Sequence, residues 1–356
     1  MLVSIIWFLI IIGILITSHE FGHYIIGVLN GIRVKEFMVG VGPAIFKKKK
    51  GDTLYSVRLL PFGGACVFDG MDELDVGDET EKIERDEHSF PNVNVWKRIA
   101  TIFAGPFANF LLAFLLSLIL VAVCGTDLPT IGSVMEGSAA EEVGLQAGDR
   151  IYLMDGERIH LYREISINSF LYDSGKPLTI GYIRDGKKYK VTLTPRYSEE
   201  DQRYYMGIIG GNDILECNAL QVFQYSFYEV EYWTKYTFKS LMKLVTGKLG
   251  VDALSGPVGV ADFVGETYEE VKPYGLSSVI LTMMNLIVLL SVNLGIMNLL
   301  PIPALDGGRL LFMLVEVVRG KPIPPEKEGL VHLAGIIFFI VLMVIVMYHD
   351  IMRLIG

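Results

Sequence analysis

The chain of 356 residues is long enough for two domains, and 51% of its residues are hydrophobic. A soluble domain carries about 45–50% apolar residues even when Gly is counted. The formal net charge of −9 argues against a nucleic-acid partner. The three cysteines, Cys66, Cys124 and Cys217, show no CxxC spacing, so the sequence indicates neither a disulfide framework nor a cysteine-based zinc site.

Four apolar segments are long enough to cross a bilayer, which takes about 20 helical residues. They run from about Leu2 to Val28, Ile99 to Cys124, Ser277 to Val318 and Leu330 to Tyr348. The first has neither a basic region before it nor a small-residue cleavage site after it, so we expect a retained span (residues 1–30) rather than a signal peptide. The second occupies residues 97–124.

The third apolar segment, residues 276–318, is broken by Pro301, Pro303 and the pair Gly307-Gly308. The fourth lies in residues 319–356 and is uncharged from Val331 to its end, apart from His332. The sequence therefore predicts a polytopic α-helical membrane protein with about four transmembrane segments.

Basic residues suggest how these segments are oriented. Lys and Arg lie in the loop between the first two spans and in the short loop between the last two, and the positive-inside rule puts both loops in the cytoplasm. We therefore expect a multi-pass protein of the plasma membrane, with both termini extracytoplasmic.

The connecting regions differ in character. Within residues 31–96, the part from 34 to 68 is predicted to be a β-structure, and 71–88 a solvated charged loop. Residues 125–200 are β-rich and resemble a PDZ domain, especially in GSAAEEVGLQAGDRIYLMDGERI (137–159). Such a module either binds a peptide along a sheet edge or serves only as a cap. Residues 201–275 are predicted to form an extracytoplasmic amphipathic region, with an ordinary packed helix as the alternative.

An HExxH motif, His19-Glu20-Phe21-Gly22-His23, lies near the inner end of the first span. On a helix, residues four apart share one face, so both imidazoles can reach one metal ion. Glu20 is placed to hydrogen-bond a water on that metal. A charged residue at the middle of a membrane helix costs about 2.5–3.5 kcal/mol, so such a group usually marks a functional site. The alternative is a polar patch that satisfies helix contacts.

A catalytic zinc ion takes three protein ligands and leaves one position for water. The best candidate for the third ligand is Asp306, which follows the two prolines of the broken third segment. Non-helical backbone at membrane depth is tolerated where it lines a cavity or is buried in protein. The alternative is that Asp306 only caps the resumed helix.

These motifs together resemble the site-2 protease family of intramembrane zinc metalloproteases, in its bacterial branch with a single PDZ domain. The resemblance rests on HEFGH (19–23) and NLLPIPALDGG (298–308), and further on LPFGGACVFDG (60–70), FAGPFANF (103–110) and LSGPVGVADF (254–263). It covers nearly the whole chain, although Ala65 and Cys66 replace bulkier residues of the family pattern.

The resemblance implies Zn²⁺ held by His19, His23 and Asp306, with Glu20 as the general base. It gives Asn298 and Pro301 a supporting role near the substrate. It also implies a membrane-associated β-loop, including Gly63 and Gly64, whose edge pairs with the unwound substrate, and an inserted extracytoplasmic α+β PDZ-like domain.

The implied activity is regulated intramembrane proteolysis near the cytoplasmic face. Its substrates would be single-span proteins already trimmed on the outer side, such as anti-sigma factors, or remnants of signal peptides. A catalytically silent PDZ-bearing scaffold and a metal transporter are the two competing hypotheses. The transporter reading is weakened because transporters usually show paired repeats with matching broken helices.

Overall fold

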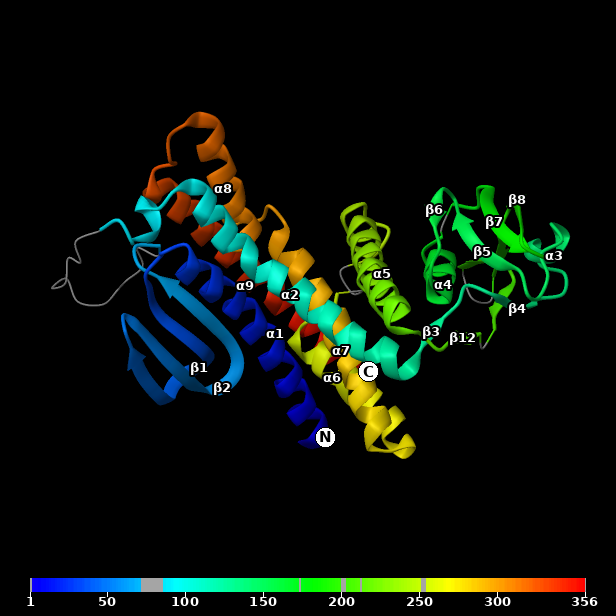
Figure 1. Ribbon diagram of the computed structural model, residues 1–356, viewed down its shortest axis with the longest axis horizontal. Helices are drawn as coiled ribbons and strands as arrows, with labels where there is room; N and C mark the ends of the chain where they lie inside the picture. Colours follow the sequence, from blue (N-terminus) through cyan, green and yellow to red (C-terminus); the bar gives the residue numbers. More distant parts are fainter. Residues whose placement is uncertain are drawn as a thin grey trace. The chain divides into compact units, whose positions relative to one another are not determined.

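The computed structural model (Figure 1) describes residues 2–71, 86–172, 174–199, 203–211, 213–250 and 254–355. Most of the charged loop predicted at 71–88 therefore lies outside the described residues. The chain divides into two compact units, one formed by Met1–Leu116 with Leu244–Gly356 and the other by Ser117–Lys243.

The first unit is built from long helices: α1 (Leu2–Leu29), the first part of α2 (Val95–Cys124), α6 (Pro257–Val271), α7 (Leu276–Leu299), α8 (Asp306–Arg319) and α9 (Pro325–Ile355). Within the described residues, four helices are long and apolar enough to cross a membrane, namely Val3–Leu29, Val95–Cys124, Leu276–Leu299 and Glu326–Arg353. The expected break in the third segment is the interval between α7 and α8.

A core cluster joins α1, α6 and α7, which Figure 1 shows running side by side. Val264 of α6 is fully buried there, together with Ile11 and Leu15 of α1 and Met283 of α7. For residues 201–275 the sequence left open an extracytoplasmic amphipathic region or an ordinary packed helix, and within this range α6 packs into the helix bundle. The reason is its apolar face, which carries Val260 and Val264 against the other helices.

A curled β-structure follows α1 and consists of β1 (Val34–Lys50) and β2 (Thr53–Phe68). Residues 36–39 of β1 have partners in both halves of β2, at 54–57 and at 64–67. The two halves of β2 therefore lie on either side of this part of β1. Its base is anchored in a cluster that includes Val34 and Phe68. The extended structure predicted for 34–68 is thus present in the form of these two strands.

The second unit contains a module with a four-stranded sheet in the order β6-β5-β7-β8 (Glu157–Arg158, Arg150–Met154, Leu178–Arg184 and Lys187–Leu193). Two short helices accompany it, α3 (Ala139–Glu142) and α4 (Tyr162–Leu171), and the core is formed mainly by aliphatic side chains such as Ile151, Ile165 and Ile180.

The strands of this module continue past residue 200, where we expected it to end. β10 (Arg203–Tyr205) pairs with β9 (Arg196–Ser198), β11 (Ile208–Gly210) with β4 (Ile131–Val134), and β12 (Ile214–Leu215) with β3 (Thr126–Asp127). The entry and exit strands of the module therefore lie side by side. Short strands of two or three residues carry too little alternation to be recognised in a sequence.

The helix α5 (Ala219–Val245) follows the module, and its Glu229 is buried against Arg163 of α4. Arg163 also binds Asp127 of β3 through several hydrogen bonds. Burial raises the pKa of Glu229 to about 7, although the Arg163 guanidinium opposes this rise. This ionic cluster ties the start of the module to α5.

Candidate metal centre

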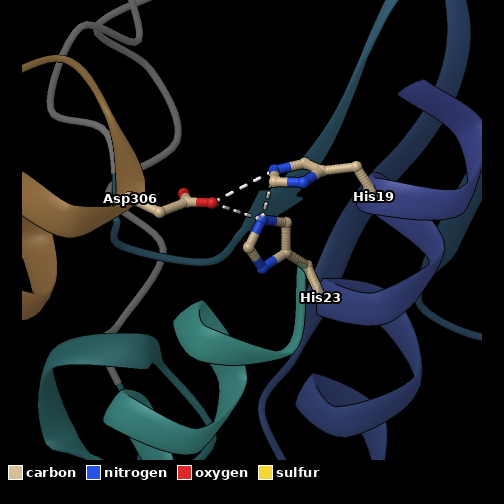
Figure 2. Close-up of side chains that lie close together, drawn as sticks. All are labelled: His19, His23 and Asp306. Carbon is tan, nitrogen blue, oxygen red and sulfur yellow. Dashed lines mark hydrogen bonds and ion pairs between the residues drawn. The ribbon is translucent and has the colours of Figure 1, made fainter. Parts of the chain in front are cut away.

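The two histidines of the HExxH motif project from one face of α1, and Asp306 reaches them from the first turn of α8 (Figure 2). The Nε2 atoms of His19 and His23 are 3.2 Å apart, and Asp306 Oδ2 lies 3.1 and 3.3 Å from them. Both histidines are buried, at 7% and 6% exposure. Within the described residues, these three form the one group of His, Cys, Asp or Glu side chains with converging ligand atoms.

The spacing of these three atoms fits a zinc ion. Two ligands about 2.1 Å from an ion at a tetrahedral angle are about 3.4 Å apart, close to the observed separations of 3.1–3.3 Å. Asp306 Oδ2 is buried and receives no hydrogen bond from the described residues. Two imidazole lone pairs and a carboxylate oxygen facing one another need a cation between them, so the residues present fit the metal.

The Nδ1 atom of each imidazole, which faces away from Asp306, has a hydrogen-bond partner in α2. His23 Nδ1 lies 2.9 Å from the carbonyl oxygen of Thr101 in α2. An N–H on Nδ1 donates to that carbonyl and leaves Nε2 unprotonated, as a ligand must be.

His19 Nδ1 lies 3.2 Å from the carboxamide of Asn109, which is fully buried in α2. The amide nitrogen Nδ2 faces the ring in the structure, and Oδ1 is buried without a partner. A half-turn of the amide exchanges the two atoms. With Oδ1 on the ring, His19 Nδ1–H donates to it, and both the orphaned oxygen and the ligand tautomer are accounted for.

Two glycines allow α1 and α2 to approach closely at the site. A Cβ on Gly105 would lie 2.3 Å from His23 Nε2, and one on Gly22 would lie 2.2 Å from the carbonyl oxygen of Ala104. The FAGPFANF segment thus supplies two features to the histidines, a bare backbone at Gly105 and the Asn109 amide, and the Thr101 carbonyl just before the segment supplies a third. The sequence resemblance includes this segment but predicts no role for Gly105 or Asn109. An amide inside an apolar span was the signal that could have found Asn109.

Glu20 lies beside β2 at the predicted substrate edge. Its Oε2 accepts a hydrogen bond of 2.9 Å from the backbone N–H of Cys66. A Cβ on Gly64 would lie 3.3 Å from Glu20 Cγ and 3.0 Å from the Met38 carbonyl, so the absence of a side chain lets the strand pass close to α1. Gly63 has a φ of +100°, a conformation that favours glycine.

Asn298 lies in the last turn of α7, and Pro301 follows it in the interval before α8. Pro301 is exposed and Asn298 half-buried. Their supporting role near the substrate stays a prediction. The structure therefore brings together His19, His23 and Asp306, and it places Glu20 with Gly64 at the edge of β2.

Contacts at both ends hold α8, whose first turn carries Asp306. Arg98 of α2 binds Glu316 of α8 at 2.5 Å, with both side chains largely buried. A Cβ on Gly307 would lie 2.1 Å from the carbonyl oxygen of Leu300, and one on Gly308 would lie 2.5 Å from that of Ile302. The two glycines let α8 begin directly against the preceding chain.

Removing the buried amide of Asn109 should weaken metal binding. We expect Asn109→Leu to lower zinc affinity by about 10–100-fold, the usual cost of losing a group that orients a ligand. Asn109→Asp keeps an acceptor for His19 Nδ1–H and should retain most of the affinity. Competition with a chelator measures both, and equal zinc affinity in the leucine variant and the wild type would refute the role of Asn109.

A His-His-carboxylate set with both histidines on a helix of membrane length, and with a glutamate next to the first histidine, is typical of a membrane-embedded metallohydrolase. The sequence profile of peptidase family M50 matches residues 7–342, and the chain belongs to this family. It is therefore a zinc metalloprotease of the site-2 type and a multi-pass membrane protein.

Similar proteins agree with this membership over the full length. The chain is 34% identical to the zinc metalloprotease RasP of Geobacillus kaustophilus, with 98% of each chain covered. It is 32% identical to the regulator of sigma-W protease RasP of Bacillus subtilis, with 99% of each covered. A solved PDZ domain of an SdrC-like protein from Listeria monocytogenes is 22% identical, with a TM-score of 0.22, covering 26% of this chain and 94% of that domain. Membership of this peptidase family supports the protease hypothesis over the scaffold and transporter hypotheses.

Proposed function

We propose that this metalloprotease holds its zinc with His19, His23 and Asp306, uses Glu20 as the general base, and hydrolyses peptide bonds within membrane-spanning segments. The carrying observation is the convergence of three ligand atoms at 3.1–3.3 Å, two of which come from a helix of membrane length. A metal centre inside a bundle of apolar helices is reached most directly by a substrate that is itself in the membrane.

Glu20 performs the proton transfers of this reaction. When bound, zinc lowers the pKa of a water to about 7 and polarises the scissile carbonyl. The Glu20 carboxylate takes the proton of the attacking water and delivers it to the leaving amide nitrogen. The Cys66 N–H on its Oε2 holds the carboxylate in place. His19 and His23 act as neutral metal ligands in this scheme and transfer no proton.

The edge of β2 next to Glu20 serves as the template for the substrate backbone. A substrate helix has to unwind before cleavage, and each freed backbone group costs several kcal/mol in lipid unless it finds a partner. The Cys66 N–H points away from β1 and toward Glu20. A substrate strand paired along residues 64–67 would therefore present its peptide bonds to the general base.

The expected topology follows the positive-inside rule. The basic residues Lys47 to Lys50 of β1 and Lys321 between α8 and α9 face the cytoplasm. Both termini and the PDZ-like module face the outside of the plasma membrane, and the metal centre lies near the cytoplasmic face. Substrates are single-span proteins already trimmed outside, such as anti-sigma factors, or remnants of signal peptides; the name of the Bacillus subtilis relative, regulator of sigma-W protease, supports the first class.

The PDZ-like module acts as a filter that admits only trimmed substrates. Because β3 and β12 pair, residues 128–213 can be replaced by a short linker with little strain. The deletion removes Arg163, so it is combined with Glu229→Gln to avoid an unpaired buried charge. We expect this variant to cut an untrimmed substrate as fast as a trimmed one, in a cleavage assay beside Glu229→Gln alone. Unchanged preference for the trimmed substrate would contradict the filter.

Metal removal and restoration test the proposal as a whole. The detergent-purified protein is stripped with a chelator and offered a single-span, outer-trimmed reporter, before and after zinc is returned. We expect cleavage to disappear and to return with one zinc per chain. Undiminished cleavage by the metal-free protein would exclude a zinc-dependent reaction.

A further inference from the structure

The short segment between α7 and α8, residues 300–305, decides where Asp306 lies. Pro301 and Pro303 have no N–H, while Ile302 donates to the Leu300 carbonyl at 2.7 Å and Leu305 to the Ile302 carbonyl at 3.2 Å. Ala304 has a φ of +75°. Among the described residues, the other non-glycines with positive φ are Asp155 and Asp185, a residue type that tolerates this conformation.

The backbone N–H of Ala304 forms a hydrogen bond with a side chain of α9. It donates to Nδ1 of His332 at 3.0 Å, across 28 residues of sequence. His332 also lies against α8, with its ring centroid 5.6 Å from that of Phe312. One helical turn further along α9, a Cβ on Gly335 would lie 2.5 Å from the Pro303 carbonyl oxygen, so α9 packs directly on this segment.

His332 is a costly residue in its position. It is the one side chain capable of carrying a charge between Val331 and Tyr348 in the apolar sequence of α9, and its side chain is only 14% exposed. Because Nδ1 accepts a hydrogen bond from the Ala304 N–H, the proton of the neutral ring resides on Nε2. The Nε2 atom is buried without a hydrogen-bond partner among the described residues and lies 3.7 Å from Glu328 Oε1. An ionisable residue retained in a membrane helix usually has a function.

We propose that His332 is a positioning residue for the metal centre, which holds the Ala304 backbone in its left-handed conformation and so aims the Asp306 carboxylate at the two histidines. The proposal rests on the assignment of Asp306 as the third metal ligand. Asp306 follows Ala304 by two residues, and relaxation of a strained backbone there would move the carboxylate. A ligand displaced by a fraction of an ångström binds the metal poorly.

A set of substitutions separates the acceptor role of Nδ1 from the packing of the ring. In His332→Asn, Oδ1 occupies the place of Nδ1 and can accept the hydrogen bond from the Ala304 N–H. In His332→Gln, the oxygen lies one bond further out, where Nε2 was, and His332→Phe keeps a ring without an acceptor. Leu333→Phe, at an exposed position of the same helix turn, is the matched control for the added phenylalanine.

The readout is zinc affinity of the full-length protein in detergent, measured by chelator competition. We expect the Phe and Gln variants to bind zinc about 10–100-fold more weakly, and the Asn variant and Leu333→Phe to remain close to the wild type. Wild-type affinity in the Phe variant, or equal losses in the Asn and Gln variants, would overturn the proposal. If the Phe variant does not fold, the comparison of Asn with Gln decides.

Asp306→Asn is measured alongside, so that the two proposals fail separately. Wild-type affinity in that variant would remove Asp306 from the ligand set and thereby the proposed site. A large loss there, with all His332 variants unchanged, would overturn only the role of His332.

Discussion

Glu20→Gln is expected to lower the rate of peptide-bond cleavage by about 10²–10⁴-fold, the usual contribution of a general base, with zinc still bound. The amide cannot take a proton from water. It keeps an oxygen for the Cys66 N–H that Glu20 now accepts at 2.9 Å, so β2 should stay in place beside α1. The measurements are cleavage of a single-span reporter and metal content of the same preparation.

Two outcomes would contradict this prediction. Similar cleavage by the variant and the wild type, with equal zinc, would show that Glu20 is not the base. Loss of zinc together with activity would mean that Glu20 acts on the metal rather than on the water.

Asp306→Asn is expected to weaken zinc binding by more than about 100-fold, because loss of a ligand should exceed the 10–100-fold cost of losing a group behind it. The carboxylate supplies the negative charge that faces His19 and His23 at 3.1 and 3.3 Å, and a neutral amide replaces it with a weaker donor. Chelator competition on the purified protein gives the affinity.

Asp350→Asn provides a matched control for that experiment. Asp350 is another buried carboxylate of the helix bundle, 2% exposed, and it accepts the Gly259 N–H at 2.7 Å instead of facing the histidines. Its amide variant should bind zinc as the wild type does. Equal losses in both variants would indicate a general disturbance of the bundle and no ligand role for Asp306.

The local part of this site follows from the sequence. A spacing of four residues on a helix places His19 and His23 together without knowledge of the tertiary fold. Asp306 could be singled out because a carboxylate after two prolines is unusual in an apolar segment. The number of membrane-length helices likewise follows from hydropathy, and the structure has four in its described part.

Contacts between distant segments could not be predicted in this way. Asn109 meets His19 across 90 residues and Thr101 meets His23 across 78, through packing of α1 on α2 that Gly22 and Gly105 permit. The same limit applies to α6, because its mixed composition is compatible both with an amphipathic surface region and with a packed helix. His332 stood out as a polar residue in an apolar run, but its partner Ala304 became evident only from the structure.

The most direct test of intramembrane zinc proteolysis is to map the bond that the enzyme cuts. The purified protein is reconstituted in liposomes with a single-span, outer-trimmed substrate, and the products are identified by mass spectrometry. We expect one cleavage inside the apolar segment of the substrate, toward its cytoplasmic end, and none with Glu20→Gln. Cleavage outside that segment, or the same product from the Glu20→Gln enzyme, would contradict this account.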